Sequence, residues 1–156
     1  MIITGADAIF SGLVSGIVAT AVMTLTEIPS WRKWGLLGVF EWHENQLLST
    51  RFFHIARNKI NFTYIFFLHF LNGSLAGIAF PLILSILDIP IKSDYTLMLS
   101  VAYGFALWIA TLVPIHKPIT GHSLWNHKLG HLPSIASLMG HLIYGLVLGI
   151  VIMITY

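Results

Sequence analysis

The sequence predicts an all-α, polytopic membrane protein with four transmembrane helices, and three observations predict it. Hydrophobic residues make up 56% of the 156 residues and charged residues only 9%, against roughly 25% charged residues in a typical soluble domain. Four long stretches contain no charged residue, and each is long enough to cross a hydrocarbon core of about 30 Å as a helix. They are far too long for barrel strands, so helices must satisfy the backbone in lipid.

The chain forms a single domain, and each predicted helix is bounded by charged or helix-starting residues. With these flanks included, the spans cover residues 7–28, 61–87, 95–115 and 133–156. No Lys or Arg precedes the first span, so we expect a retained helix rather than a cleaved signal peptide. Pro133 is well placed to open the last helix. Apolar residues at helical spacing within Glu44–Lys59 predict a short amphipathic helix in the headgroup region.

The distribution of basic residues predicts how the helices are oriented. The first and third connections together carry seven Lys and Arg residues: Arg32, Lys33, Arg51, Arg57, Lys59, Lys117 and Lys128. The second connection carries one, Lys92. Because basic connections stay in the cytoplasm, we expect the first and third connections there and both termini outside the cell membrane.

Two spans share a pattern that predicts an internal repeat. His69 and His141 each begin a His-x-x-x-Gly-x-x-x-Gly-Ile motif, and the first and third spans carry related glycine spacings. We interpret the chain as two tandem helical hairpins in the same orientation. Glycines four residues apart form a flat strip on a helix, so a tightly packed bundle is expected.

The paired histidines at matching depth are the first candidate site. His69 and His141 each lie on the order of 10 to 15 Å along their helices at 1.5 Å per residue. Three interpretations are open: an interhelical hydrogen bond, a shared copper, zinc or iron ion, or bis-histidine haem b. Haem needs the helices held apart, whereas the neighbouring glycines favour close approach.

The cytoplasmic face holds the second candidate site. His122, His127 and His131 follow one another in the third connection, and a four-residue spacing predicts that His127 and His131 share a helical face. Acidic and histidine residues of the first connection are able to complete a metal site there: Glu27, Glu41, His43 and Glu44. The alternative is a set of solvated histidines at the membrane interface.

Several chemistries are excluded by composition. Cysteine is absent, so disulfides, thiolate metal sites and cysteine nucleophiles are excluded. The formal net charge of +2, without a basic run, argues against nucleic-acid binding. No glycine-rich phosphate loop or catalytic triad is found, so we expect no enzyme activity from this chain alone.

The two ends of the chain resemble a known type of protein. Residues 11–25 and 140–149, SGLVSGIVATAVMTL and GHLIYGLVLG, are similar to the opening and closing helices of small uncharacterised four-helix membrane proteins of prokaryotes. The resemblance implies the fold and brings no activity or catalytic residues. The isoleucine-rich composition also resembles archaeal proteins. Small helical proteins of this type occur as accessory subunits of archaeal membrane oxidoreductases such as ammonia monooxygenase.

Three functions are therefore expected, in order. The first is a non-catalytic accessory subunit whose partners are other membrane subunits, copies of itself and the lipid bilayer. The second is a metal- or haem-binding redox protein that uses His69 and His141. The third is a small oligomeric transporter or channel, for which four spans with two inward histidines give a sparse lining.

Overall fold

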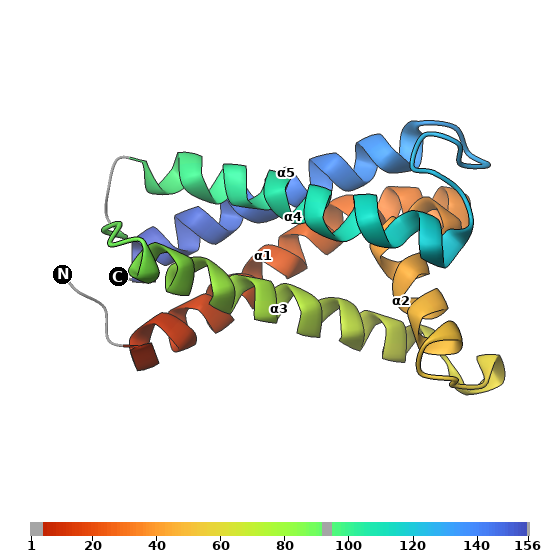
Figure 1. The fold of residues 1–156 in the computed structure, drawn as a ribbon, viewed down its shortest axis with the longest axis horizontal. Coiled ribbons are helices and arrows are strands. Elements are labelled where there is room, and N and C mark those ends of the chain that lie inside the picture. The colour runs from red at the N-terminus through yellow and green to blue at the C-terminus, as the bar shows by residue number, and fades with distance from the viewer. Residues whose placement is uncertain (1–4, 92–94, 156) are drawn as a thin grey trace.

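The computed structural model describes residues 5–91 and 95–155, which form an all-helical bundle (Figure 1). The α-helices are α1 (Gly5–Trp34), α2 (Phe40–Arg51), α3 (Phe62–Ile86), α4 (Thr96–Thr120) and α5 (Leu132–Thr155), with 3₁₀ helices at Gly35–Gly38 and Arg57–Lys59. Four helical segments among these residues are long and apolar enough to cross a membrane, and this confirms the predicted number of candidate spans. Lys92, which the sequence assigns to the second connection, lies outside the described residues.

Two helices continue beyond their predicted ends. α1 passes through Pro29 to Trp34, and α4 passes through Pro114 and Pro118 to Thr120. Prolines are tolerated in membrane helices because neighbouring groups take over the freed backbone partners. α4 ends only at Gly121, whose φ of 81° is the left-handed conformation that favours glycine. The extension brings residues that we expected in a connection into the bundle.

The helix of the first connection lies earlier in the chain than predicted. α2 covers Phe40–Arg51, whereas the apolar spacing favoured Glu44–Lys59. The helix ends at Arg51, and three residues later His54 adopts a left-handed φ of 51°, which prevents a helix from continuing to Lys59. Phe40 and Trp42 are fully buried at the start of α2, so this end of the helix is anchored in the bundle. Its predicted position in the headgroup region stays a prediction.

The helices pack in contacting pairs, α1 with α3 and α4 with α5, and α1 also packs along α5. Glycines set the closest approaches. A Cβ added at Gly77 would lie 2.4 Å from Gly16 Cα, and one at Gly104 would lie 2.3 Å from the His141 carbonyl oxygen. Glycines of the predicted strips, such as Gly16, Gly77 and Gly145, therefore lie against a neighbouring backbone.

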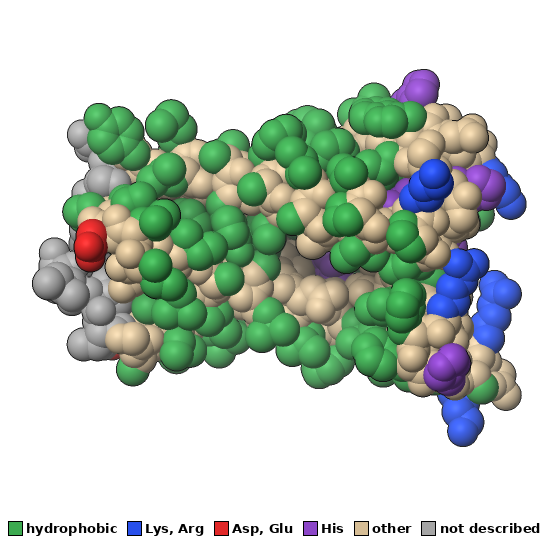
Figure 2. All heavy atoms as spheres, viewed as in Figure 1, with side chains coloured by type: hydrophobic (Ala, Val, Ile, Leu, Met, Phe, Trp, Pro, Cys, Tyr) green, Lys and Arg blue, Asp and Glu red, His purple; other side chains and the backbone are tan. Residues whose placement is uncertain are grey.

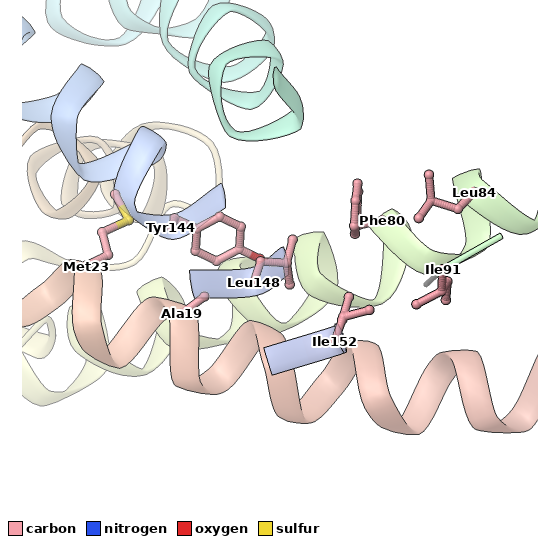
Figure 3. Close-up of a cluster of buried hydrophobic side chains, with 8 residues drawn as sticks. All are labelled: Ala19, Met23, Phe80, Leu84, Ile91, Tyr144, Leu148 and Ile152. Carbon is pink, nitrogen blue, oxygen red and sulfur yellow. The ribbon is translucent and has the colours of Figure 1, made fainter. Parts of the chain in front are cut away.

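A cluster of buried apolar side chains fills the half of the bundle nearer the termini. Its members come from α1, α3 and α5 together with Ile91: Ala19, Met23, Phe80, Leu84, Ile91, Tyr144, Leu148 and Ile152 (Figure 3). Leu148 and Ile152 are completely buried. Burial in lipid gives no hydrophobic gain between helices, so these residues stabilise the bundle through close packing.

The outer surface separates apolar and charged side chains. Hydrophobic side chains cover the middle of the bundle, and Lys and Arg gather at the end that carries α2 (Figure 2). The start of α1 and the end of α5 lie at the opposite end of the bundle (Figure 1). Phe10, Phe67 and Ile86 are 63 to 80% exposed, which in water would be costly. The fold is that expected of a multi-pass membrane protein.

Candidate functional site

Three glutamates and three histidines form a buried polar centre inside the bundle. We call these residues the Glu–His centre: Glu27, Glu41, Glu44, His69, His116 and His141. The glutamates come from α1 and α2, and each of the other three long helices contributes one histidine. Ionisable side chains inside a membrane bundle are costly, and such groups usually carry a function.

The shortest contact of the centre joins α2 to α4. His116 Nδ1 lies 2.7 Å from Glu44 Oε1, and His116 is fully buried. The Phe40 ring packs 4.5 Å from the imidazole, measured between ring centroids. His116 Nε2 is buried without a hydrogen-bond partner among the described residues. One side of this imidazole is thus held by a carboxyl group, and the other side is unsatisfied.

The second pair joins α2 to α5. His141 Nδ1 lies 2.9 Å from the Ser137 carbonyl oxygen and 3.5 Å from Glu41 Oε1. The Ser137 hydroxyl donates to the same carboxyl oxygen of Glu41. A carbonyl oxygen only accepts hydrogen bonds, so His141 carries its hydrogen on Nδ1. The opposite nitrogen, Nε2, is therefore an unprotonated acceptor when the imidazole is neutral.

The third pair joins α1 to α3. His69 Nε2 lies 3.1 Å from Thr24 Oγ1 and 3.8 Å from Glu27 Oε2. The Thr24 hydroxyl donates its hydrogen to the Thr20 carbonyl oxygen at 2.7 Å, so Thr24 accepts from His69 Nε2. The carboxyl group of Glu41 is the other polar neighbour of Glu27, but neither oxygen of Glu27 makes a hydrogen bond of normal distance and angle within the described residues, although Glu27 is only 5% exposed. An unsatisfied buried carboxyl group is expensive.

A cavity of about 420 Å³ reaches the centre from the side of the bundle. α3 and α4 meet at Tyr103, whose hydroxyl donates to the Ala76 carbonyl oxygen at 2.8 Å. Nearer α2 these two helices diverge (Figure 1). His69, His141 and Glu41 line the cavity together with apolar residues of α3 and α4. Figure 2 shows the hollow between α3 and α4, with a histidine at its bottom.

The first candidate pair, His69 and His141, lines this common cavity. Whether the two residues bind a cofactor stays a prediction. Glu27, Glu41 and Glu44, which we assigned to a cytoplasmic metal site, instead face His69, His141 and His116 of the long helices. Glu41 and Glu44 are separated from their predicted partners His122 and His131 because α2 packs against the long helices.

The remaining predicted residues are placed differently. Residues 121–131 form turns, and α5 begins at Leu132, so the helical face predicted for His127 and His131 is wrong. His127 Nδ1 accepts from the Leu129 backbone N–H at 3.1 Å. His122 is exposed, and the His131 ring lies 5.9 Å from that of Trp125. Gly130, with a φ of 70°, reverses the chain and prevents a continuous helix.

Titration of the loop histidine agrees with its hydrogen bond. Burial lowers the pKa of His127, and the nearby charges of His116, His122 and Lys128 lower this pKa further. A lowered pKa keeps the imidazole neutral near pH 7, as the acceptor role of Nδ1 requires.

His43 lies on α2 and lines a separate surface cavity with Thr50 and His54. Within residues 5–91 and 95–155, no three His, Asp or Glu side chains are placed to hold one metal ion.

Sequence analysis missed His116, Thr24 and Ser137 as members of the site. His116 follows Pro114 and precedes Pro118, and this signal suggested the edge of a connection rather than a buried helical position. Thr24 and Ser137 lie three and four residues from Glu27 and His141 on their own helices. Helical neighbours at that spacing share a face, so this spacing is the signal that identifies them.

Removing the Glu44 carboxyl group should destabilise the protein. We expect Glu44→Leu to lower the free energy of unfolding by about 2 kcal/mol, because His116 would lose its hydrogen-bond partner while staying buried. Glu44→Gln retains a hydrogen-bonding group at this position and should cost less. Thermal unfolding in detergent micelles, followed by circular dichroism, measures both. Equal losses for the two variants would contradict the assigned hydrogen bond.

The fold and the site define a class: a small, multi-pass helical protein with a Glu–His centre beside a laterally open cavity. Residues 6–156 match the model of a family described as "Family of unknown function (DUF6789)". The chain belongs to this family. No curated protein matches it significantly, and neither does any solved structure.

Proposed function

We propose that this protein binds a lipid-soluble molecule at the Glu–His centre, within the bilayer. The observation that carries the proposal is the cavity of about 420 Å³ between α3 and α4, with His69, His141 and Glu41 at its inner end. Ligand sites have volumes of about 300–1,000 Å³ and combine apolar walls with a few converging polar groups. This cavity has both properties.

The route into the cavity favours a ligand that comes from the membrane. Leu75 on α3 and Ile115 on α4 line the cavity and are 57% and 40% exposed on the outside of the bundle. Between α3 and α4 the opening faces the surface that is covered with hydrophobic side chains (Figure 2). A water-soluble ligand would have to cross this apolar surface. A molecule dissolved in the bilayer meets the opening directly.

The distribution of basic residues assigns the Glu–His centre to one half of the bilayer. The seven Lys and Arg residues of the first and third connections lie at the α2 end, so that end is assigned to the cytoplasm. The centre then lies in the cytoplasmic half of the bilayer, and both termini are outside. The tandem-hairpin repeat is supported by the glycine contacts of α1 with α3 and of α4 with α5.

The accessory-subunit hypothesis is compatible with a ligand site and stays a prediction. So do the archaeal origin, the resemblance to subunits of membrane oxidoreductases and the transporter alternative. Native purification in mild detergent tests the subunit hypothesis, since a solitary stable protein would contradict it. Elemental analysis and an absorption spectrum of native material test the metal and haem alternatives.

Filling the cavity should prevent ligand retention. Ala76 lines the cavity from α3, so Ala76→Trp places an indole inside it. We expect the wild-type protein, but not this variant, to retain a hydrophobic molecule through purification. Mass spectrometry of an organic extract measures this retention. Ala110→Trp is the matched control, because Ala110 is exposed on α4 and does not line the cavity. Identical extracts from all three proteins would refute the proposed function.

A further inference from the structure

The hydrogen-bonding groups of the cavity specify the polar group of the ligand, an inference that rests on the proposed function. All three hydroxyl side chains that line the cavity already donate to helix carbonyl oxygens. Thr20 donates to Gly16 at 2.7 Å, and Thr111 donates to Leu107 at 2.6 Å. Tyr144 donates to Gly73 at 2.7 Å. None of these hydroxyl hydrogens is left for a ligand.

Acceptors, in contrast, are left over at the inner end of the cavity. The hydrogen of His69 is on Nε2, toward Thr24 and Glu27, and the hydrogen of His141 is on Nδ1, toward Ser137 and Glu41. The other nitrogens, His69 Nδ1 and His141 Nε2, make no hydrogen bond within residues 5–91 and 95–155. A neutral imidazole has one lone pair, which is on the nitrogen that carries no hydrogen.

Besides the carboxyl groups of Glu41 and Glu44, two amide side chains belong to the polar lining. Asn72 Nδ2 donates to Asn45 Oδ1 at 3.2 Å, and both residues line the cavity. Each amide nitrogen carries two hydrogens, so this pair retains hydrogens that a ligand oxygen can accept. The lining thus offers imidazole acceptors at one position and amide donors at another.

We propose that the ligand is a lipid-soluble alcohol or phenol. Its hydroxyl group donates a hydrogen to the free nitrogen of His69 or His141. A hydroxyl is a small neutral group with one hydrogen to donate to an imidazole and two lone pairs that accept from the amides. An ether or a hydrocarbon leaves the imidazole lone pairs unpaired, and an unpaired buried polar group discriminates strongly between ligands. The apolar walls take the chain or ring of the same molecule.

The test uses two probes of nearly equal shape, 4-nonylphenol and its methyl ether, 4-nonylanisole. Tritiated probes are bound to the full-length protein in nanodiscs, with empty nanodiscs subtracted and concentrations compared within the lipid. We expect the phenol to bind at least about tenfold more tightly than the ether, since only the phenol has a hydrogen to donate. Equal binding of both probes would overturn the inference and leave the proposed function standing. Binding of neither probe would overturn the proposed function as well.

Variants assign the preference to the imidazoles. His69→Phe and His141→Phe each replace an acceptor by a ring of similar shape, and each should lower the preference for the phenol. His131→Phe is the matched control, because His131 is exposed in the third connection and does not line the cavity. An unchanged preference in both cavity variants would contradict the role of the histidines. If a variant fails to fold, the two probes on the wild-type protein still decide the inference.

Discussion

Replacing Gly77 by valine should separate α1 from α3 and lower the free energy of unfolding by roughly 3 kcal/mol. A Cβ at this position would lie 2.4 Å from Gly16 Cα and 2.5 Å from the Gly12 carbonyl oxygen. Both atoms belong to the backbone of α1, so no side-chain rotation relieves the contact. The two helices must move apart, and the close packing that stabilises helix pairs in lipid is lost.

A graded series separates this clash from the intrinsic effect of losing a glycine. Gly77→Ala adds only the Cβ and should cost less than valine. Gly5→Ala is the control for a Cβ that causes no clash, because a Cβ on Gly5 meets nothing within 4 Å. Unfolding midpoints in detergent micelles, compared with the wild type, measure the series. Equal midpoints for Gly5→Ala and Gly77→Ala would contradict the predicted contact.

The spans could be predicted from the sequence because they depend on local composition. An uncharged apolar stretch has to be helical in lipid wherever it packs, so the four helices follow from the sequence alone. Helix ends depend on competition between local sequence signals and burial, and some of the predicted ends were wrong. Pro114 and Pro118 predicted an early end, whereas α4 continues to Thr120.

The candidate site was only partly predictable, because it depends on how α2 folds against the long helices. The sequence identified the glutamates and the His69 and His141 pair as notable residues, but it placed the glutamates at the membrane surface. Phe40 and Trp42 are at most 1% exposed, and they anchor the start of α2 inside the bundle. Nothing in the spacing of these residues distinguishes an anchor in the core from one in the headgroups, since aromatic residues suit both environments.

Replacing Glu27 by methionine should make the protein more stable, by about 1–3 kcal/mol, because the cost of burying an unsatisfied carboxyl group is removed. Glu27 is 5% exposed, its carboxyl oxygens have no hydrogen-bond partner among the described residues, and His69 Nε2 is 3.8 Å away. Methionine fills a similar volume without a polar group that needs a partner. The expected cost is functional, because Glu27 faces the protonated nitrogen of His69 and helps to keep the free nitrogen toward the cavity. The variant should therefore lose part of its preference for 4-nonylphenol over the ether.

The direction of this change tests what surrounds Glu27 in the native protein. Thermal unfolding of Glu27→Met and Glu44→Leu should shift in opposite directions, since Glu44 has a hydrogen-bonded partner, His116, and Glu27 has none among the described residues. A loss of stability in Glu27→Met would mean that the carboxyl group has a stabilising partner in the native protein: Glu41, His69, a bound cation or another subunit. Such a result would contradict the assignment of Glu27 as an unsatisfied group. A gain would mean that a costly buried carboxyl group is retained for its effect on His69, as a trade of stability for function requires.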